Sequence, residues 1–280
     1  MRWINKRDKQ NRKRGHAIVK KFLNRGWDNT LGRYVNCSYS DILGEGSITH
    51  LLLREQGYVC CYCMRAIAYK KHTTLEHVLP RKTKQEDSNT ITYYLNSARY
   101  MKRYVKWTKE PPQYRVKVPP FPHYCAYENL VASCDGSVYD INNPDYQYPS
   151  KLHNCCNNIR GQKEIIPMFF LENIDHILIY ESDGELTYDD MYESTINAIN
   201  LQYPTLKLMR RAWAKISKLY TVEDVENAVV NKDLRDVIID DSLLSSVDGN
   251  LLKKDNFWNL LLEYRWFYTY FKQKRYKRKG

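Results

Sequence analysis

The chain has 280 residues and a formal net charge of +12, from 44 basic and 32 acidic side chains. This length is enough for one large domain or two modest ones, and the positive charge favours polyanionic partners, above all nucleic acid. No stretch approaches the ~20 consecutive apolar residues of a membrane-spanning helix, and residues 1–8 lack an apolar signal-peptide core. We therefore expect a cytoplasmic protein that does not associate with a membrane.

Two helices are predicted before the first cysteine cluster. The N-terminal segment is dense in Lys and Arg, and Ile18 and Phe22 lie on one face of a helix predicted over residues 11–24. This helix is either a solvated surface element docked by its two apolar residues or a basic arm that contacts phosphate. A second helix is predicted over residues 47–56, with Gly57 as its stop signal.

Five of the eight cysteines form two tight clusters, which are Cys60-Cys61-Tyr62-Cys63 and Cys155-Cys156. A cytosolic setting disfavours disulfides, and the two-residue gap between Cys60 and Cys63 lets both sulfurs reach one zinc ion. A redox dithiol would instead sit at the start of a helix after a βαβ strand, and no such pattern follows. We therefore predict a metal site, with Cys37 and Cys125 as buried thiols outside it.

A short β-prone run begins at Thr73 and ends at Pro80, and it contains Glu76 and His77. In a strand these two side chains leave opposite faces, unless a bulge or the strand end changes the pattern. A single His beside a Glu is more often structural than catalytic. The cysteines on both sides of the run favour a functional role here.

Residues 92–108 carry four cations at positions i, i+3, i+4 and i+7, which predicts a helix with one basic face. Such a stripe is either solvated surface or an element that grips a nucleic-acid strand. The four cations are Arg99, Lys102, Arg103 and Lys106. Residues 135–153 form a second polar segment, rich in Asn, Asp, Tyr and Pro, whose ends must return close together if the cysteines on either side share a metal.

The last third of the chain is predicted to be mainly helical. Residues 165–180 are apolar and β-prone, with a turn predicted at 181–185. From Leu206 the apolar residues follow a three-four rhythm typical of an amphipathic helix, and Thr221 can cap a further helix. A last helix over residues 256–271 is apolar on most faces, so it must be buried in the core or against a partner. We expect the basic tail after it to be mobile and to add nonspecific DNA affinity.

The order of these motifs resembles the HNH, or ββα-metal, endonucleases over roughly residues 47–165. The shared pattern is Cys-x-x-Cys, acidic-His-x-x-Pro, Asn-Leu, then Cys and Cys-Asn-x-x-x-Gly. Met-Arg-x-Ile at the start, Leu-x-x-Glu-Gln-Gly-x-x-Cys-x-Tyr-Cys, Glu-His-x-x-Pro and Glu-Asn-Leu-x-x-Ser-Cys are more narrowly similar to the PtuB subfamily. That subfamily supplies the HNH subunit of Septu antiphage systems and of some retrons, where it works with a PtuA-type ATPase.

The resemblance implies roles for individual residues. His77 is the general base that takes a proton from the attacking water, and Glu76 stands where the superfamily usually has Asp, as a ligand of a catalytic divalent ion. Asn129 matches the middle Asn of the motif and braces the loop that presents the base. Asn157 occupies the last position, where some members have His and others have Asn as a metal ligand, and Asn158 is the alternative.

Two metal sites are predicted from this chemistry. Mg²⁺ or Mn²⁺ prefers oxygen ligands in an open catalytic site, whereas thiolates suit a closed structural zinc ion, Zn²⁺. The family pattern favours Cys156 over Cys155 because Cys156 directly precedes Asn157. The predicted zinc ligands are Cys60, Cys63, Cys134 and Cys156.

The sequence therefore predicts an α+β protein in three parts: a basic N-terminal arm (1–46), a zinc-stapled ββα-metal core with two insertions (47–165) and a mainly α-helical C-terminal region that can dock a partner (166–280). The expected activity is hydrolysis of phosphodiester bonds in DNA, with RNA as the alternative, under control of an ATPase. The basic stripe, inserted between the base and Asn129, is expected to grip the substrate strand. Other interpretations are a noncatalytic zinc-binding interaction module and a Cys-x-x-Cys oxidoreductase.

Overall fold

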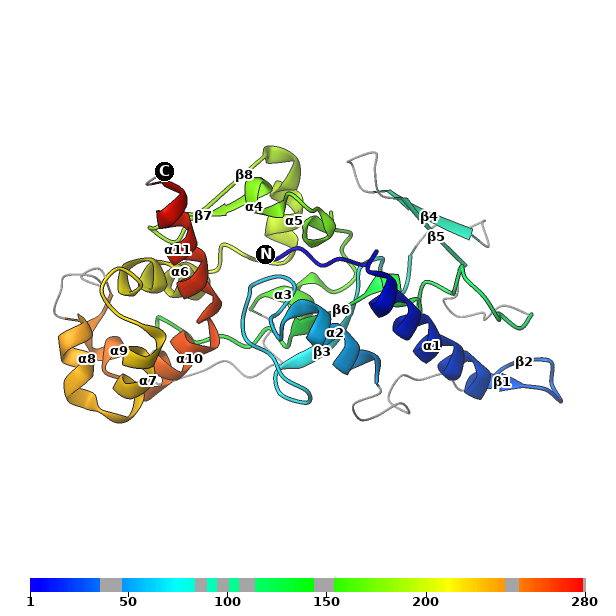
Figure 1. Cartoon of the computed structure of the whole chain (residues 1–280), viewed down its shortest axis with the longest axis horizontal. Coiled ribbons are helices and arrows are strands. Elements are labelled where there is room, and N and C mark those ends of the chain that lie inside the picture. The colour runs from blue at the N-terminus through cyan, green and yellow to red at the C-terminus, as the bar shows by residue number, and fades with distance from the viewer. Residues whose placement is uncertain are drawn as a thin grey trace.

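The structure is a computed structural model that describes residues 1–35, 47–83, 90–94, 101–105, 114–143, 154–239 and 247–278. Helices and small antiparallel sheets alternate along these residues, so the fold is α+β, as predicted. Figure 1 shows the N-terminal helix at one end of the molecule, the segments that carry the cysteines in the middle, and the C-terminal helices at the other end. Within these segments, no helix has both the length and the apolar character that crossing a membrane requires.

The described strands form four antiparallel pairs. These pairs are β1 (Trp27–Asp28) with β2 (Arg33–Tyr34), β3 (Thr73–His77) with β6 (Leu130–Cys134), β4 (Thr90–Tyr94) with β5 (Met101–Val105), and β7 (Leu178–Tyr180) with β8 (Leu186–Tyr188). In the β3–β6 pair, Thr73 lies opposite Cys134 and His77 lies opposite Leu130. The cysteine end and the histidine end of this pair are therefore roughly 14 Å apart along the strand.

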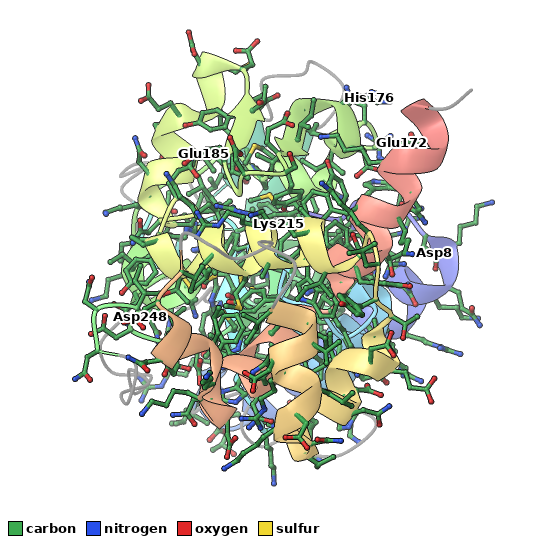
Figure 2. All side chains as sticks on the ribbon, turned by 90° about the vertical axis from the view of Figure 1, so that its left-hand side faces the viewer. Asp8, Glu172, His176, Glu185, Lys215 and Asp248 are labelled. Carbon is green, nitrogen blue, oxygen red and sulfur yellow. The ribbon has the colours of Figure 1, made fainter. Side chains whose placement is uncertain are left out.

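The described residues also form helices along the chain. They are α1 (Lys9–Gly26), α2 (Ile48–Gln56), α3 (Cys156–Arg160), α4 (Ile174–Ile177), α5 (Glu193–Ala198), α6 (Pro204–Ile216), α7 (Val222–Val230), α8 (Lys232–Ile239), α9 (Gly249–Leu252), α10 (Asp255–Glu263) and α11 (Trp266–Arg278), with short 3₁₀ turns η2 (Tyr127–Asn129), η4 (Met168–Phe170) and η5 (Asp190–Tyr192). Figure 2 looks at the molecule from the side of the C-terminal helices, where Lys215 of α6 is labelled.

Local capping signals place several helices where the sequence predicts them. Ser47 caps α2, and Gly57 ends it in the left-handed conformation with φ of 65°. Thr221 and Asp224 form a capping box at the start of α7. Asp8 accepts the backbone N–H of Asn11 and starts α1 slightly earlier than expected.

The predicted basic helix within residues 92–108 is wrong, because its described residues form the hairpin β4–β5. Ile91 and Tyr104 are paired across the strands and both are buried. Every residue of β4 is β-branched or aromatic, and this preference for strand prevails over the three-four spacing of the cations.

The single helix predicted over residues 256–271 is two helices, because the chain breaks between α10 and α11. The carbonyl of Glu263 accepts the backbone N–H of Ala66 at 2.6 Å, so a distant segment takes the acceptor that a continuous helix would use. After the break α11 continues as a helix to Arg278. Residues 272–278 of the basic tail belong to this helix, and residues 279–280 lie outside the described part. That the tail is mobile and adds DNA affinity stays a prediction.

One hydrophobic core extends through the molecule. Ile4 from the N-terminal segment, Leu52 from α2, Trp213 from α6 and Phe267 from α11 all belong to it and are at most 3% exposed. The extended N-terminal segment joins the later part of the chain directly, since the N–H of Ile4 donates to the carbonyl of Phe169 at 2.7 Å.

Candidate functional site

Four cysteine sulfurs meet at one end of the β3–β6 pair. The Sγ atoms of Cys60, Cys63, Cys134 and Cys156 all lie within 4.8 Å of one another, and all four side chains are buried. The Cys60–Cys156 and Cys63–Cys134 separations are 3.9 and 3.7 Å. A tetrahedral zinc with Zn–S bonds of about 2.3 Å places its sulfurs about 3.8 Å apart, whereas a disulfide requires about 2 Å. The four thiols therefore fit a zinc ion, and the predicted ligand set is confirmed as a cluster that can hold one.

The alternative ligand Cys155 is not one of the four sulfurs that lie within 4.8 Å of one another, although its thiol interacts with those of Cys63, Cys134 and Cys156. Its Sγ is 3.8 Å from the carbonyl oxygen of Gly136. Gly136 has φ of 78°, and a Cβ there would meet the carbonyl of Cys155, so glycine allows the chain after β6 to pass against the start of α3. Cys125 is a buried thiol outside the cluster, as predicted, and Cys37 lies outside the described residues.

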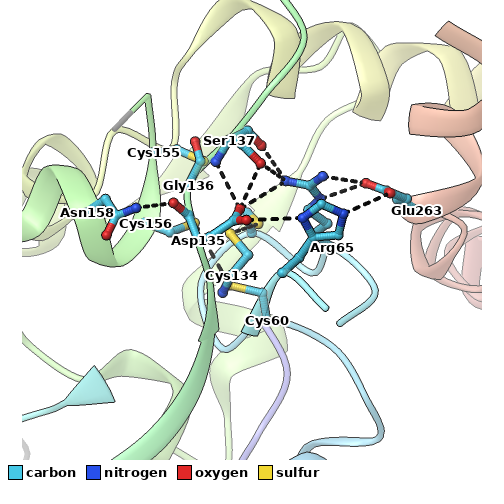
Figure 3. A network of polar contacts seen from close by, with 12 residues as sticks. Cys60, Arg65, Cys134, Asp135, Gly136, Ser137, Cys155, Cys156, Asn158 and Glu263 are labelled. Carbon is cyan, nitrogen blue, oxygen red and sulfur yellow. Dashed lines mark hydrogen bonds and ion pairs between the residues drawn. The ribbon is translucent and has the colours of Figure 1, made fainter. Parts of the chain in front are cut away.

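A buried arginine ties this centre to the C-terminal helices. Figure 3 shows Arg65 between Glu263 of α10 and the segment that follows Cys134. Its Nε lies 2.7 Å from Glu263, and its Nη1 lies 3.1 Å from the Ser137 hydroxyl and 3.6 Å from Asp135. Although burial acts in the opposite direction, hydrogen bonds from His72 and Ser137 and the charge of Arg65 lower the pKa of Asp135 to about 2.

At the other end of β3, the ring of His77 is held by one backbone carbonyl. Its Nε2 lies 2.9 Å from the oxygen of Tyr124, and the two rings are nearly parallel with centroids 5.7 Å apart. A carbonyl only accepts, so Nε2 carries the proton and the lone pair of the neutral ring is on Nδ1. Burial lowers the pKa of His77 to about 4, and the charges of His123 and Arg81 act in the same direction. The hydrogen bond to Tyr124 acts in the opposite direction. Near pH 7 the ring is therefore neutral and can accept a proton.

Asn129 braces the loops around this ring. Its Oδ1 accepts the N–H of Leu79 at 2.7 Å, and its Nδ2 donates to the carbonyls of Leu79 and His123 at 3.1 and 2.7 Å. The amide thus joins the loop after β3 to the loop that carries Tyr124. The structure contains the bracing contact that the resemblance implied for this residue.

Glu76 lies on the opposite face of β3 from His77 and is 4% exposed. Its Oε1 accepts the hydroxyl of Tyr62 at 2.9 Å and forms an ion pair with Arg160. Asn157 donates to the Thr74 hydroxyl at 3.0 Å, on the same face of β3 as Glu76. Among the described residues, no contact joins either side chain to the His77 ring.

The predicted oxygen site for a catalytic ion is therefore not assembled in this arrangement. A divalent ion bound to Glu76 would have to displace the Arg160 guanidinium or use the other carboxylate oxygen. Asn158 does not contact this site either, because its amide donates to the carbonyl of Asp135 beside the cysteine cluster. The roles of Glu76 and Asn157 as ligands of Mg²⁺ or Mn²⁺ stay predictions.

Sequence reasoning missed Arg160, which is 1% exposed and fixes the strand end that carries His77. Besides Glu76, its guanidinium donates to the carbonyls of His77 at 2.7 Å, Val78 at 2.6 Å and Lys163 at 3.0 Å. The sequence feature that could have identified Arg160 is its position three residues after Asn157. This spacing places both side chains on the face of α3 that meets β3.

No protein-family model matches this chain, and the comparisons with curated proteins and with solved structures also return no match. The resemblance to HNH endonucleases therefore depends on the sequence motifs alone. Because Cys60 and Cys63 are part of a four-sulfur cluster, the geometry favours metal binding over a redox dithiol.

The predicted nucleic-acid stripe has to be corrected together with its helix. Lys102 and Arg103 are neighbours on β5 and so point to opposite faces, while Arg99 and Lys106 lie outside the described residues. The Nζ of Lys102 is 3.9 Å from Glu128 and faces the body of the protein, whereas Arg103 is exposed.

Proposed function

We propose that this chain is an HNH-type endonuclease that hydrolyses phosphodiester bonds in DNA. The observation that carries the proposal is the His77 ring, whose Nε2 proton is bound to the carbonyl of Tyr124 and whose Nδ1 can accept a proton. The ring lies on the first strand of a strand-strand-helix unit, β3, β6 and α3, and four thiols gather at the far end of that unit. Both features agree with the motif order in the sequence.

In the proposed reaction, Nδ1 of His77 removes a proton from a water molecule that attacks the phosphorus. As the new O–P bond forms, the P–O bond to one sugar oxygen breaks, and solvent water protonates that leaving oxygen. The bond to the Tyr124 carbonyl favours the resulting imidazolium. The guanidinium of Arg81 lies 4.1 Å from the Tyr124 ring, and its charge can attract the phosphate to this side of the loop. The residues around Glu76 do not form an oxygen site as they stand, so we assign no step to a bound divalent ion.

The zinc ion has a structural role in this proposal. It joins the turn after α2, the end of β6 and the start of α3, which come from positions up to 96 residues apart. A closed four-thiolate site has no open position for a substrate, so chemistry at the zinc itself is not expected.

The decisive test is cleavage of plasmid DNA in the presence of Mg²⁺ or Mn²⁺, with the zinc-loaded chain alone and with an ATPase partner. His77→Ala should abolish cleavage, and His176→Ala, which changes an exposed histidine, should not. Both variants should retain zinc and the wild-type melting temperature. Cleavage by His77→Ala at the wild-type rate would rule out His77 as the base.

We further propose that the nuclease works as the effector of a PtuA/PtuB-type antiphage system under control of an ATPase. The sequence motifs support this proposal, and its test is whether the purified ATPase forms a complex with the chain and changes its cleavage rate.

A noncatalytic zinc-binding module is the second candidate, favoured by the ion pair that occupies Glu76. The absence of cleavage under all these conditions, with zinc bound, would support it.

A further inference from the structure

We propose that the Tyr264 hydroxyl is a hydrogen-bond donor to Cys63 as a zinc ligand, so that the ion also fixes the junction between α10 and α11. The inference goes beyond the proposed function, in which the ion joins only the turn after α2, the end of β6 and the start of α3. It rests on the structural zinc ion of that proposal and is independent of cleavage. Tyr264 is a positioning residue here, since it contacts a metal ligand rather than the metal.

The Tyr264 hydroxyl points at a member of the sulfur cluster. It lies 3.8 Å from the Sγ of Cys63, which is 201 residues away in the chain, and the Tyr264 side chain is fully buried. Among the described residues, this hydroxyl makes no other hydrogen bond. A buried hydroxyl that lacks a partner destabilises the fold, so the placement of this ring depends on the sulfur.

Cys63 depends on this donor more than Cys60 does. The Sγ of Cys60 accepts two backbone N–H groups, from Cys134 at 3.2 Å and from Tyr62 at 3.4 Å. For Cys63, the Tyr264 hydroxyl is the one donor outside the cysteines within the described part of the chain. A zinc-bound cysteine is a thiolate, and hydrogen bonds to an ionised group are about twice as strong as those between neutral groups. Zinc loading therefore strengthens the contact with Tyr264.

Two neighbouring contacts hold the same junction against the cysteine turn. The carbonyl of Glu263 accepts the backbone N–H of Ala66 at 2.6 Å, and its carboxylate lies 2.7 Å from the Nε of Arg65. Arg65 is tied to the turn, because its own carbonyl accepts the N–H of Cys60 at 2.8 Å. Figure 3 shows Glu263 facing Arg65 beside the cysteine cluster. The break between α10 and α11 is thus built on the turn that carries two of the four sulfurs.

The junction transmits this restraint to the C-terminal helices. Tyr264 ends α10, and its ring is stacked on that of Phe267 near the start of α11, with centroids 6.4 Å apart. The indole N–H of Trp213 in α6 donates to the carbonyl of Leu261, one turn before the junction, at 2.8 Å. Zinc loading should therefore stabilise the packing of α10 and α11 on the cysteine turn as well as the sulfur cluster itself.

The first test is zinc affinity, measured by competition with a chromophoric zinc chelator. Tyr264→Phe removes only the hydroxyl and should weaken zinc binding about tenfold, at the lower end of the ~10–100-fold range for groups that support a metal ligand. The matched control is Tyr127→Phe, which removes a buried hydroxyl that lies 2.6 Å from Glu55 rather than from a sulfur. The control should change zinc affinity by less than about twofold.

Two further readouts separate an effect on the sulfur from general loosening of the fold. With Co²⁺ in place of zinc, the sulfur-to-metal charge-transfer bands of Tyr264→Phe should move to lower energy, because a thiolate that loses a hydrogen bond gives up electron density more readily. In the zinc-loaded protein, the Ala66 amide should exchange its hydrogen about tenfold faster in Tyr264→Phe than in the wild type, because the coupling between the two contacts is reciprocal. Tyr127→Phe should leave both readouts unchanged.

Equal losses of zinc affinity in Tyr264→Phe and Tyr127→Phe would mean that any buried hydroxyl matters, and they would overturn the proposal. Wild-type zinc affinity in Tyr264→Phe, or cobalt bands at the wild-type position, would overturn it as well. A wild-type chain that binds no zinc would refute the metal site itself. A zinc-loaded wild-type chain that does not cleave DNA would refute only the nuclease proposal, since none of these readouts depends on cleavage.

Discussion

Arg160→Met tests the buried contact on which the strand end depends. The substitution keeps most of the side-chain volume and removes the guanidinium that binds Glu76, the Tyr62 hydroxyl and three backbone carbonyls. Removal of one partner from a buried ion pair costs about 3–5 kcal/mol, because the other charge stays buried without compensation. This loss is a large part of the ~5–15 kcal/mol that stabilises a typical domain. In a chain of this length we expect the melting temperature to fall by roughly 6–20 °C.

Glu76→Gln and the double variant Glu76→Gln/Arg160→Met separate the free energy of the ion pair from that of the other Arg160 contacts. Glu76→Gln leaves an oxygen that can accept from Arg160, and the guanidinium keeps its carbonyl partners, so the expected cost is about 1–3 kcal/mol. The double variant Glu76→Gln/Arg160→Met has no buried charge left and should be more stable than the sum of the single effects predicts, by about 1–3 kcal/mol.

The destabilisation by Arg160→Met should also depend on pH. Burial raises the pKa of Glu76 and Arg160 opposes this, so loss of Arg160 raises the folded-state pKa further above the unfolded value. A carboxyl whose pKa is higher in the folded state destabilises the fold at pH values above that pKa, and the effect disappears as the pH falls toward the unfolded value near 4.5. The difference between the variant and the wild type should therefore be larger at pH 8 than at pH 5.5.

The assay is urea unfolding of the zinc-loaded proteins at both pH values, followed by tryptophan fluorescence. A difference below about 1 kcal/mol between Arg160→Met and the wild type would refute the reasoning. Strict additivity in the double variant would refute it as well. In the folded fraction, Arg160→Met should also lower cleavage, because the carbonyls of His77 and Val78 lose their donor.

Three further predictions concern the metal, the base and the turn beside the cysteines. Cys156→Ser should lower the bound zinc measured by mass spectrometry, and Cys155→Ser should leave it near one ion per chain. Because the pKa of His77 is lowered to about 4, its ring stays neutral as the pH falls from 8 to 6. The decrease of kcat/KM on the acid side should therefore begin below pH 6. A decrease centred near pH 6.5 would contradict the role of His77 as a base with a lowered pKa. Gly136→Ala should cost roughly 1–3 kcal/mol in thermal unfolding, owing to its positive φ and the Cys155 carbonyl, and an unchanged melting temperature would show that the turn can adapt.

Much of the candidate site could be predicted from short motifs. The two-residue gap of Cys60 and Cys63 and the position of Cys156 before Asn157 led to the sulfur cluster that the structure contains. The bracing contact of Asn129 followed from the family resemblance. The partner of Glu76 did not, because the motif describes residue order, whereas the ion pair depends on how α3 packs on β3.

The sequence by itself determined the elements whose signals lie within a few residues. Ser47 and Gly57 delimit α2, and the capping box begins α7, since each cap is satisfied by its own neighbours. Tertiary structure decided the contacts between distant segments. Ala66 takes the carbonyl of Glu263 and ends α10, and strand pairing turns the cationic stripe around Lys102 into a hairpin. The free energy of such contacts depends on which surfaces meet in the folded chain, and local residue spacing carries no record of that.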